Sequence, residues 1–372
     1  MKKILLNLAS VVVAILIIVV SMPVCFATDY SGTGENGYTW QFDGATGTMT
    51  VKGTGEMEDS FYMNWNGEDN RLLDFEIDLS PMIRKLIISE GITSIGHRAF
   101  AGLTEMTSVD IPNTVTKIEP IAFADAWKLE SITIPEGVTI LGGTCFKACK
   151  GIKTITIPDT VTEIGRDAFR GCVALESVVI SNNVEIIPED CFLGCKNLVD
   201  VQFGSSVKII EAKAFKECSS LRQVVLPESV ERIEFDEAFS YCHNLEKIYI
   251  PSSITYISGQ TFLSQYTTGN IKDIYFGGSK EAWDALNPED ISDIQNATIH
   301  YNSKPSDMNP VPENSNSDNG EDNIGNMNSE PNSSNTGADD SDKGGAGPVI
   351  GAVAGVAAVG AGVTYIFIKK RK

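Results

Sequence analysis

The sequence predicts a β-rich solenoid, a stack of similar coils, and three observations lead to this fold class. A 23-residue unit recurs, and its first, fourth and sixth residues are apolar, as in Leu129, Ile132 and Ile134. The last two residues share one face of a short β-strand. A phenylalanine also recurs in one slot of successive units. Because no single copy can bury these side chains, the copies are expected to stack and share one core. Seven copies begin at Ile83, Met106, Leu129, Ile152, Leu175, Leu198 and Leu221.

Each unit ends its strand with a proline or a small residue, as at Pro135. Proline cannot donate to a strand ladder, so this position is the strand's end. Two apolar residues three apart follow, such as Val138 and Leu141, and then Ala-Phe in a short turn or helix. This order predicts a parallel sheet on one face of a leucine-rich repeat solenoid and short helices or turns on the other. Evenly spaced strands also suit a β-sandwich, but a sandwich needs no exact recurrence.

The repeat resembles the BspA-like leucine-rich repeat family of surface proteins, through the L-x-x-[VI]-x-[IL]-P-x-x-V-x-x-I-G-x-x-[AC]-F-x-x-C run of Ile152–Cys172. The resemblance spans about Trp40 to Tyr301. Thr39–Met57 is similar to the family's N-terminal cap, and Ile274–Leu286 with residues 297–301 is similar to its C-terminal cap. The resemblance implies that the protein is displayed outside the cell. Several members of the family are linked to adhesion, but the repeat itself specifies no ligand.

The segments before the repeats predict export and a cap. Residues 1–27 are interpreted as a signal peptide, because Lys2 and Lys3 precede a long apolar run and Ala27 offers a cleavage point. An uncleaved anchor is the alternative. Residues 28–82 are expected to form the N-terminal cap, with a hairpin that joins Trp40–Phe42 to Met49–Val51. Residues 83–302 are assigned to the solenoid with its C-terminal cap.

The segments after the repeats predict a membrane anchor. Residues 303–348 are rich in Asn, Ser, Asp and Gly with little apolar content, so we expect a disordered acidic linker or stalk. Residues 349–368 carry no charge and are long enough for one transmembrane helix, and residues 369–372 form a basic cytoplasmic tail. Gly351 and Gly355 make a G-x-x-x-G pair through which a homodimer could form. The predicted localisation is a single-pass protein of the plasma membrane with an extracellular ectodomain.

Charge and cysteine positions restrict the possible partners. The net charge of −20 makes nucleic acid an unsuitable ligand. Seven of the eight cysteines fall in two recurring slots, which favours buried free thiols over disulfides. Cys145 with Cys149 and Cys191 with Cys195 could be metal half-sites, but they lack nearby histidine partners. We therefore expect no metal and no cofactor.

A catalytic site is not predicted. His97, His243 and His300 lie in unrelated contexts, and none of the sequence motifs of hydrolases or phosphate-binding loops occurs. The many carboxylates occupy irregular slots, so no acid–base pair can be selected. The protein is therefore predicted not to be an enzyme.

A candidate partner-binding surface lies at the C-terminal end of the repeats. The third and fifth residues of each unit should point outward from the sheet, and they are mostly Ser and Thr in the middle copies. Later copies differ, because Tyr249 and Tyr275 should be neighbours on adjacent strands. Tyrosine among polar groups suits recognition, although cross-strand aromatic pairs also stabilise sheets. The candidate residues are Gln223, Val225, Lys247, Tyr249, Asp273 and Tyr275.

These features predict a cell-surface binding module for a protein or glycan ligand, in adhesion or protein–protein interaction. A structural or scaffolding protein of the cell envelope without a host ligand is the alternative. A hydrolase with an unrecognised site is the third and weakest hypothesis.

Overall fold

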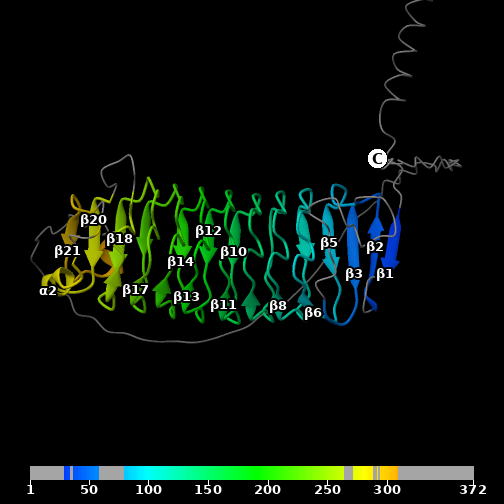
Figure 1. Ribbon diagram of the computed structural model, residues 1–372, viewed down its shortest axis with the longest axis horizontal. Helices are drawn as coiled ribbons and strands as arrows, with labels where there is room; N and C mark the ends of the chain where they lie inside the picture. Colours follow the sequence, from blue (N-terminus) through cyan, green and yellow to red (C-terminus); the bar gives the residue numbers. More distant parts are fainter. Residues whose placement is uncertain are drawn as a thin grey trace, which may run out of the picture. The chain divides into compact units, whose positions relative to one another are not determined.

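The computed structural model describes residues 29–33, 37–57, 79–263, 271–287, 291 and 294–308. These residues form a β-solenoid whose coils follow one another from β1 at one end to β21 at the other (Figure 1). The predicted parallel solenoid is confirmed. The predicted signal peptide, the transmembrane helix with Gly351 and Gly355, and most of the linker lie outside the described residues.

The first strand ladder contains the strand predicted in each repeat. It runs from an antiparallel hairpin into parallel pairs and is divided along the stack into three hydrogen-bonded sheets. The copy that begins at Leu129 contributes only a bridge, between Ser108 and Ser131. Its strands are β1 (Tyr30–Thr33), β2 (Thr39–Asp43), β3 (Thr48–Lys52), β5 (Lys85–Ile88), β7 (Ser108–Asp110), β10 (Thr154–Thr156), β12 (Ser177–Val179), β14 (Asp200–Gln202), β16 (Gln223–Val225), β18 (Lys247–Ile250), β20 (Asp273–Phe276) and β21 (Thr298–His300).

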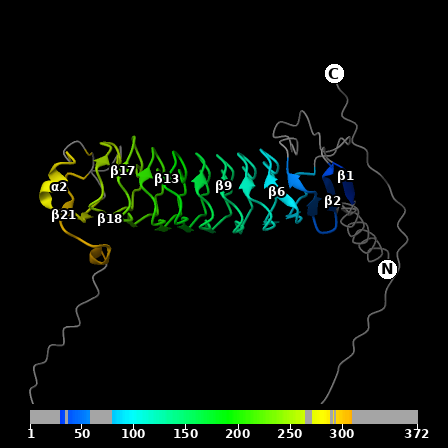
Figure 2. The same ribbon diagram turned by 90° about the horizontal axis from the view of Figure 1, so that it is seen from below.

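A second strand ladder was not predicted. Most of its strands contain the second of the two apolar residues that follow the proline, such as Leu141, together with the residue before it, and they pair in parallel within two hydrogen-bonded sheets (Figure 2). The strands are too short to show a period-two pattern, which is why the sequence did not reveal them. They are β4 (Gly55–Glu56), β6 (Ile92–Ile95), β8 (Lys117–Ile118), β9 (Ile140–Leu141), β11 (Glu163–Ile164), β13 (Ile186–Ile187), β15 (Ile209–Ile210), β17 (Arg232–Ile233) and β19 (Tyr256–Ile257).

The Ala-Phe segments form turns in the coils that the structure describes, so of the two predicted alternatives, short turns or short helices, the turns are confirmed. In one coil, the N–H groups of Thr144, Phe146 and Ala148 each donate to a carbonyl of the next coil, at 2.7–2.9 Å. The intervening N–H groups bond three residues back within the coil. Thr144 and Ala148 have φ values of 56° and 57°. A left-handed residue costs about 1–2 kcal/mol, and it turns alternate N–H groups toward the neighbouring coil where a helix would keep them internal.

The core is a set of parallel columns of identical side chains. The phenylalanines at 100, 123, 146, 169, 192, 215, 239 and 262 stack with ring centroids 5.2–6.0 Å apart. All eight side chains are buried. Each contributes about 1.5–3 kcal/mol through burial, and aromatic stacking adds about 0.5–1.5 kcal/mol for each pair.

The cysteines line the core as free thiols, as the repeat slots predicted. Cys149, Cys172, Cys195, Cys218 and Cys242 each donate a hydrogen bond from Sγ to the carbonyl of a phenylalanine in the preceding coil, at 3.2–3.3 Å. Burial raises the pKa of every described thiol, to about 12 for Cys172 and Cys242. Metal binding needs the thiolate, so these side chains act as small apolar residues with a weak donor.

The N-terminal cap contains the predicted hairpin, in which Trp40 pairs with Val51 and Phe42 with Met49. These four side chains are buried and belong to the hydrophobic core. In the connection, the Asp43 carboxylate accepts hydrogen bonds from the Ala45 and Thr46 N–H groups, and its pKa is lowered first by the Thr46 side chain and then by these two backbone bonds.

The C-terminal cap closes the other end of the stack. A one-turn helix, α2 (Lys280–Asp284), is capped by the Ser279 hydroxyl and places Trp283 on Phe276, with ring centroids 5.2 Å apart. The described chain then continues through β21 into a 3₁₀ turn, η3 (Pro305–Met308), where Met308 is fully buried. Packed structure therefore includes residues 303–308, which the sequence pattern assigns to the linker. Among the described residues, no helix has the length and apolar character that a bilayer crossing requires.

Gly204 provides a test of the spacing between coils. It occupies the slot that is proline in most copies, and a Cβ there would overlap the carbonyl oxygen of Ser181. At Gly171 a Cβ would meet nothing closer than 3.8 Å, although φ is +72°. We expect Gly204→Ala to destabilise the protein by about 3 kcal/mol and Gly171→Ala by about 1 kcal/mol in urea unfolding. Equal effects would contradict the close approach of the coils.

The buried thiols should not react with alkylating reagents while the protein is folded. With iodoacetamide at pH 8, we expect the seven described cysteines to remain almost unlabelled in buffer and to react fully in denaturant, as read by mass spectrometry. A Thr156→Cys variant places a thiol on the outward face of β10 and should react at once. Rapid labelling of Cys195 in the native protein would show that the coils open or that the thiol is accessible.

Candidate functional site

The six candidate residues lie on adjacent strands of the first ladder, in the predicted register. Gln223 pairs with Lys247 and Val225 with Tyr249, and the next strand places Asp273 beside Lys247 and Tyr275 beside Tyr249. The structure therefore brings all six together, over β16, β18 and β20. Their exposure, however, is not uniform.

Tyr249 does not face solvent, contrary to the expectation for an outward residue. Its side chain is only 2% exposed, and its hydroxyl donates to Glu228 Oε1 at 2.5 Å. The turn η3 lies against β18 and β20 and covers this part of the outward face. Burial raises the pKa of the Tyr249 hydroxyl, with a further contribution from the bond to Glu228. The sequence could not reveal this because residues 303–308 carry no repeat pattern.

Tyr275 stacks on a residue that sequence reasoning had left aside. Its ring lies 4.6 Å from that of His300, with 14° between the ring planes, and β21 pairs with β20 so that the two residues are neighbours. His300 Nε2 is 2.8 Å from Asp273 Oδ1. Tyr275, His300 and Asp273 thus form one partly exposed cluster at the end of the ladder. The signal was present in the ATIHY segment, which places His300 one strand after Tyr275.

The accessible part of the candidate surface offers recognition groups. Val225 is 36% exposed, Gln223 is exposed, and the Lys247 ammonium donates to the Met308 carbonyl oxygen at 3.4 Å. Aromatic, amide and charged groups of this kind suit contacts with a protein or glycan. No cluster of three or more His, Cys, Asp or Glu side chains that could hold a metal ion occurs in the described ranges.

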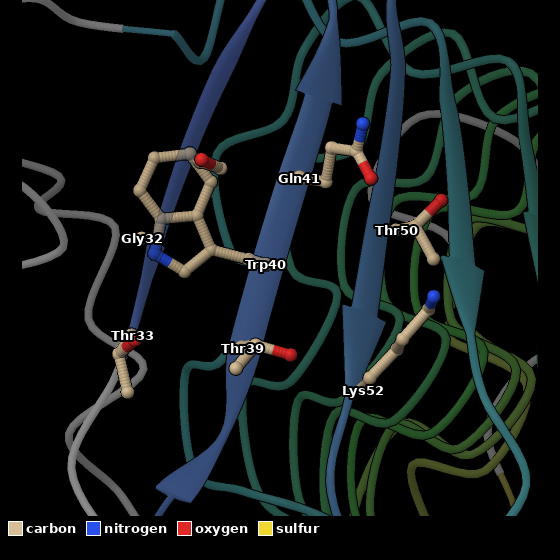
Figure 3. A pocket seen from close by; sticks show the side chains of 8 residues that line it. Gly32, Thr33, Thr39, Trp40, Gln41, Thr50 and Lys52 are labelled. Carbon is tan, nitrogen blue, oxygen red and sulfur yellow. The ribbon is translucent and has the colours of Figure 1, made fainter.

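A separate hollow lies at the opposite end of the ladder, over β1, β2 and β3 (Figure 3). It measures about 320 Å³ and is lined by Ser31, Gly32, Thr33, Thr39, Trp40, Gln41, Thr50 and Lys52. Gly32 leaves room for the Trp40 ring, because a Cβ there would lie 2.5 Å from the indole. Among the described residues that line the hollow, Lys52 alone is ionisable.

Sequence reasoning missed three exposed apolar side chains, two on separate strands of the second ladder and one just after β17. Ile186 and Tyr256 are each 43% exposed, and the Arg232 guanidinium lies 4.9 Å from the Tyr256 ring centroid. Phe235 is 62% exposed with φ of 59°. A signal did exist, because Phe235 lies in the copy that has 24 residues where its predecessors have 23.

The buried hydroxyl of Tyr249 predicts a pH effect on stability. The folded protein keeps this group neutral, whereas an unfolded tyrosine ionises near pH ~10. Its contribution is therefore complete below that pH and is lost as the pH rises toward the folded pKa. We expect Tyr249→Phe to cost about 1 kcal/mol at pH 7, and the gap to wild type to shrink between pH 9 and 11 in urea unfolding. Tyr256→Phe, in an exposed ring, is the control, and a gap of constant size would contradict the prediction.

Solved structures of other leucine-rich repeat proteins are similar to this chain. One from Bacteroides ovatus is 25% identical, with a TM-score of 0.43, over 59% of this chain and 66%, just under two thirds, of that one. A leucine-rich repeat protein of T. pallidum is 21% identical over 51% of this chain and 90% of its own, with a TM-score of 0.37. A leucine rich cell surface protein of Faecalibacterium prausnitzii is 21% identical over 69% of this chain and 97% of its own, with a TM-score of 0.28.

No curated protein matches the chain. The family model of the BspA type leucine rich repeat region matches six copies, over residues 79–199 and 162–285. Together the two matches span more than half of the 372 residues. The chain belongs to the BspA-type leucine-rich repeat family.

Proposed function

We propose that the protein is a cell-surface binding module, which uses the outward face of the first ladder in adhesion or protein–protein contact. The observation that carries this proposal is the cluster of Tyr275, His300 and Asp273 beside Val225 and Gln223 on a rigid ladder. Tyrosine and charged side chains at fixed spacing are the groups on which binding energy usually concentrates. The middle of the same face, with Ser and Thr, offers no comparable anchor.

The proposed location rests on the terminal segments of the sequence. Residues 1–27 would direct export, residues 303–348 would form a linker of which 303–308 are folded onto the solenoid, and residues 349–368 would anchor the chain in the plasma membrane. The cell-surface relative from Faecalibacterium prausnitzii agrees with this location. The ligand is proposed to be a protein or glycan outside the cell, and dimerisation through Gly351 and Gly355 stays a sequence-based hypothesis.

The scaffolding alternative has one observation in its favour. Phe235, which follows β17, is 62% exposed, and Ile186 and Tyr256 are exposed three strands apart on the second ladder; a partner that covers these side chains would remove apolar surface from water. In this alternative the partner is a component of the protein's own envelope.

Capture experiments with the full-length chain should separate these functions. We expect the wild type to retain a component of extracellular-matrix or cell-wall extracts, and Tyr275→Ser with Asp273→Ala to weaken its affinity about 30-fold, as truncating an interface anchor does. Thr154→Ala with Thr156→Ala, on the same face three coils or more away, is the matched control and should bind normally. Tyr249 is left intact because it is buried.

The identity of the captured component decides between the alternatives. Retention of a matrix or wall component supports the binding module. Capture of membrane proteins of the same cell alone, lost in Phe235→Ser and kept in Tyr275→Ser, would favour the scaffold. Equal capture by the cluster variant and the control would remove the cluster from the proposal.

A further inference from the structure

The turn η3 covers an outward surface that capping does not require it to cover. The open end of the solenoid is already closed by β21 and by Trp283 of α2. The turn lies instead against β18 and β20, and β18 is two strands inward from the end. On this face the outward residues of the middle coils stay open, whereas Tyr249 is 2% exposed.

The turn is built as a compact unit that rests on the ladder. Within it, the Asp307 N–H donates to the Lys304 carbonyl at 2.9 Å, and the Lys304 N–H donates to the Asp307 carboxylate at 2.7 Å. The chain before it is secured, because the Ser303 N–H donates to the Phe276 carbonyl at 2.9 Å. The turn therefore keeps its shape through its own hydrogen bonds, and the bond of Ser303 to Phe276 fixes the point at which the chain enters it.

Contact between the turn and the ladder has the character of a bound peptide. The Met308 side chain is completely buried. The Lys247 ammonium donates to the Met308 carbonyl oxygen at 3.4 Å, a long hydrogen bond. One unbranched apolar side chain and one weak polar contact are a small anchor, and methionine is the apolar residue that adapts most readily to different surfaces.

We propose that Pro305–Met308 is an internal ligand, which occupies in cis a peptide-binding surface made by Lys247, Tyr249, Asp273 and Tyr275. The partner that fits this surface is a short protein segment of the same chemistry, a turn with an acidic residue followed by an unbranched apolar side chain. The inference deepens the proposed function, since it places the binding site under the turn and makes release of the turn the step that opens it.

The test uses the full-length chain and a free peptide of residues 303–310, SKPSDMNP, labelled with ¹³C on the methionine methyl group. Short tethers give effective concentrations of the order of mM, so binding is followed by NMR up to ~5 mM peptide. In Met308→Asp the tethered turn should leave the face, because a buried unpaired carboxylate is unfavourable. We expect this variant to bind the peptide at least tenfold more tightly than the wild type does, and a peptide with Asp for Met not to bind.

Ser306→Asp is the matched control, because it adds the same charge to an exposed residue of the same turn. It should bind the peptide as weakly as the wild type. Met308→Ser provides a milder release if Met308→Asp perturbs the fold, which circular dichroism reports. Failure of both variants to fold would overturn the proposal, since the turn would then be a structural part of the domain.

The remaining outcomes are also decisive. If a folded Met308 variant does not bind the peptide, no peptide surface exists beneath the turn. If the wild type binds as tightly as the variant, the surface is not occupied in cis. Either result leaves the proposed function standing on the capture experiment, whereas peptide binding without any captured component would support the surface and not the proposed function.

Discussion

Alignment of equivalent residues in neighbouring coils is the constraint on which the rest of the structure depends. The phenylalanine rings stack at 5.2–6.0 Å, which requires successive coils to follow the same path; the extra residue of the copy that begins at Leu221 leaves the stack intact, because Phe215 and Phe239 are 5.2 Å apart. The thiols that bond to phenylalanine carbonyls and the backbone bonds between turns depend on the same alignment. This is why a repeat of constant length recurs through most of the array.

The alignment is maintained at the expense of local backbone preference. Two residues in most coils adopt left-handed φ values, and several, such as Ile121 with φ of 66°, are unfavourable residue types for that conformation. Hydrogen bonds to the next coil and burial of the core offset this strain. The interactions that stabilise the fold therefore lie mainly between neighbouring coils, and an isolated coil would not keep its conformation.

Sequence reasoning succeeded for the features that side-chain burial imposes on every copy and failed for those that depend on contacts beyond one copy. The period, the strand containing Ile155, the phenylalanine column and the free thiols follow from burial of identical slots, and the structure confirms them. The second ladder and the helix-free turns depend on hydrogen bonds between coils, which leave no pattern within one copy. Tyr249 was placed outward correctly by register, but the turn η3, which lies outside any repeat, packs against its strand.

Because the coils have the same geometry, the number of coils sets the distance between the surfaces at the two ends of the solenoid. The hollow near Lys52 and the cluster at Tyr275 are separated by a run of strands that each advance the stack by about 4.8 Å. Because a coil contacts only its neighbours, inserting or deleting one whole 23-residue unit would shift the two ends by that step and leave both surfaces intact. The distance between the two surfaces can thus change in steps of one coil while the residues of each surface stay the same.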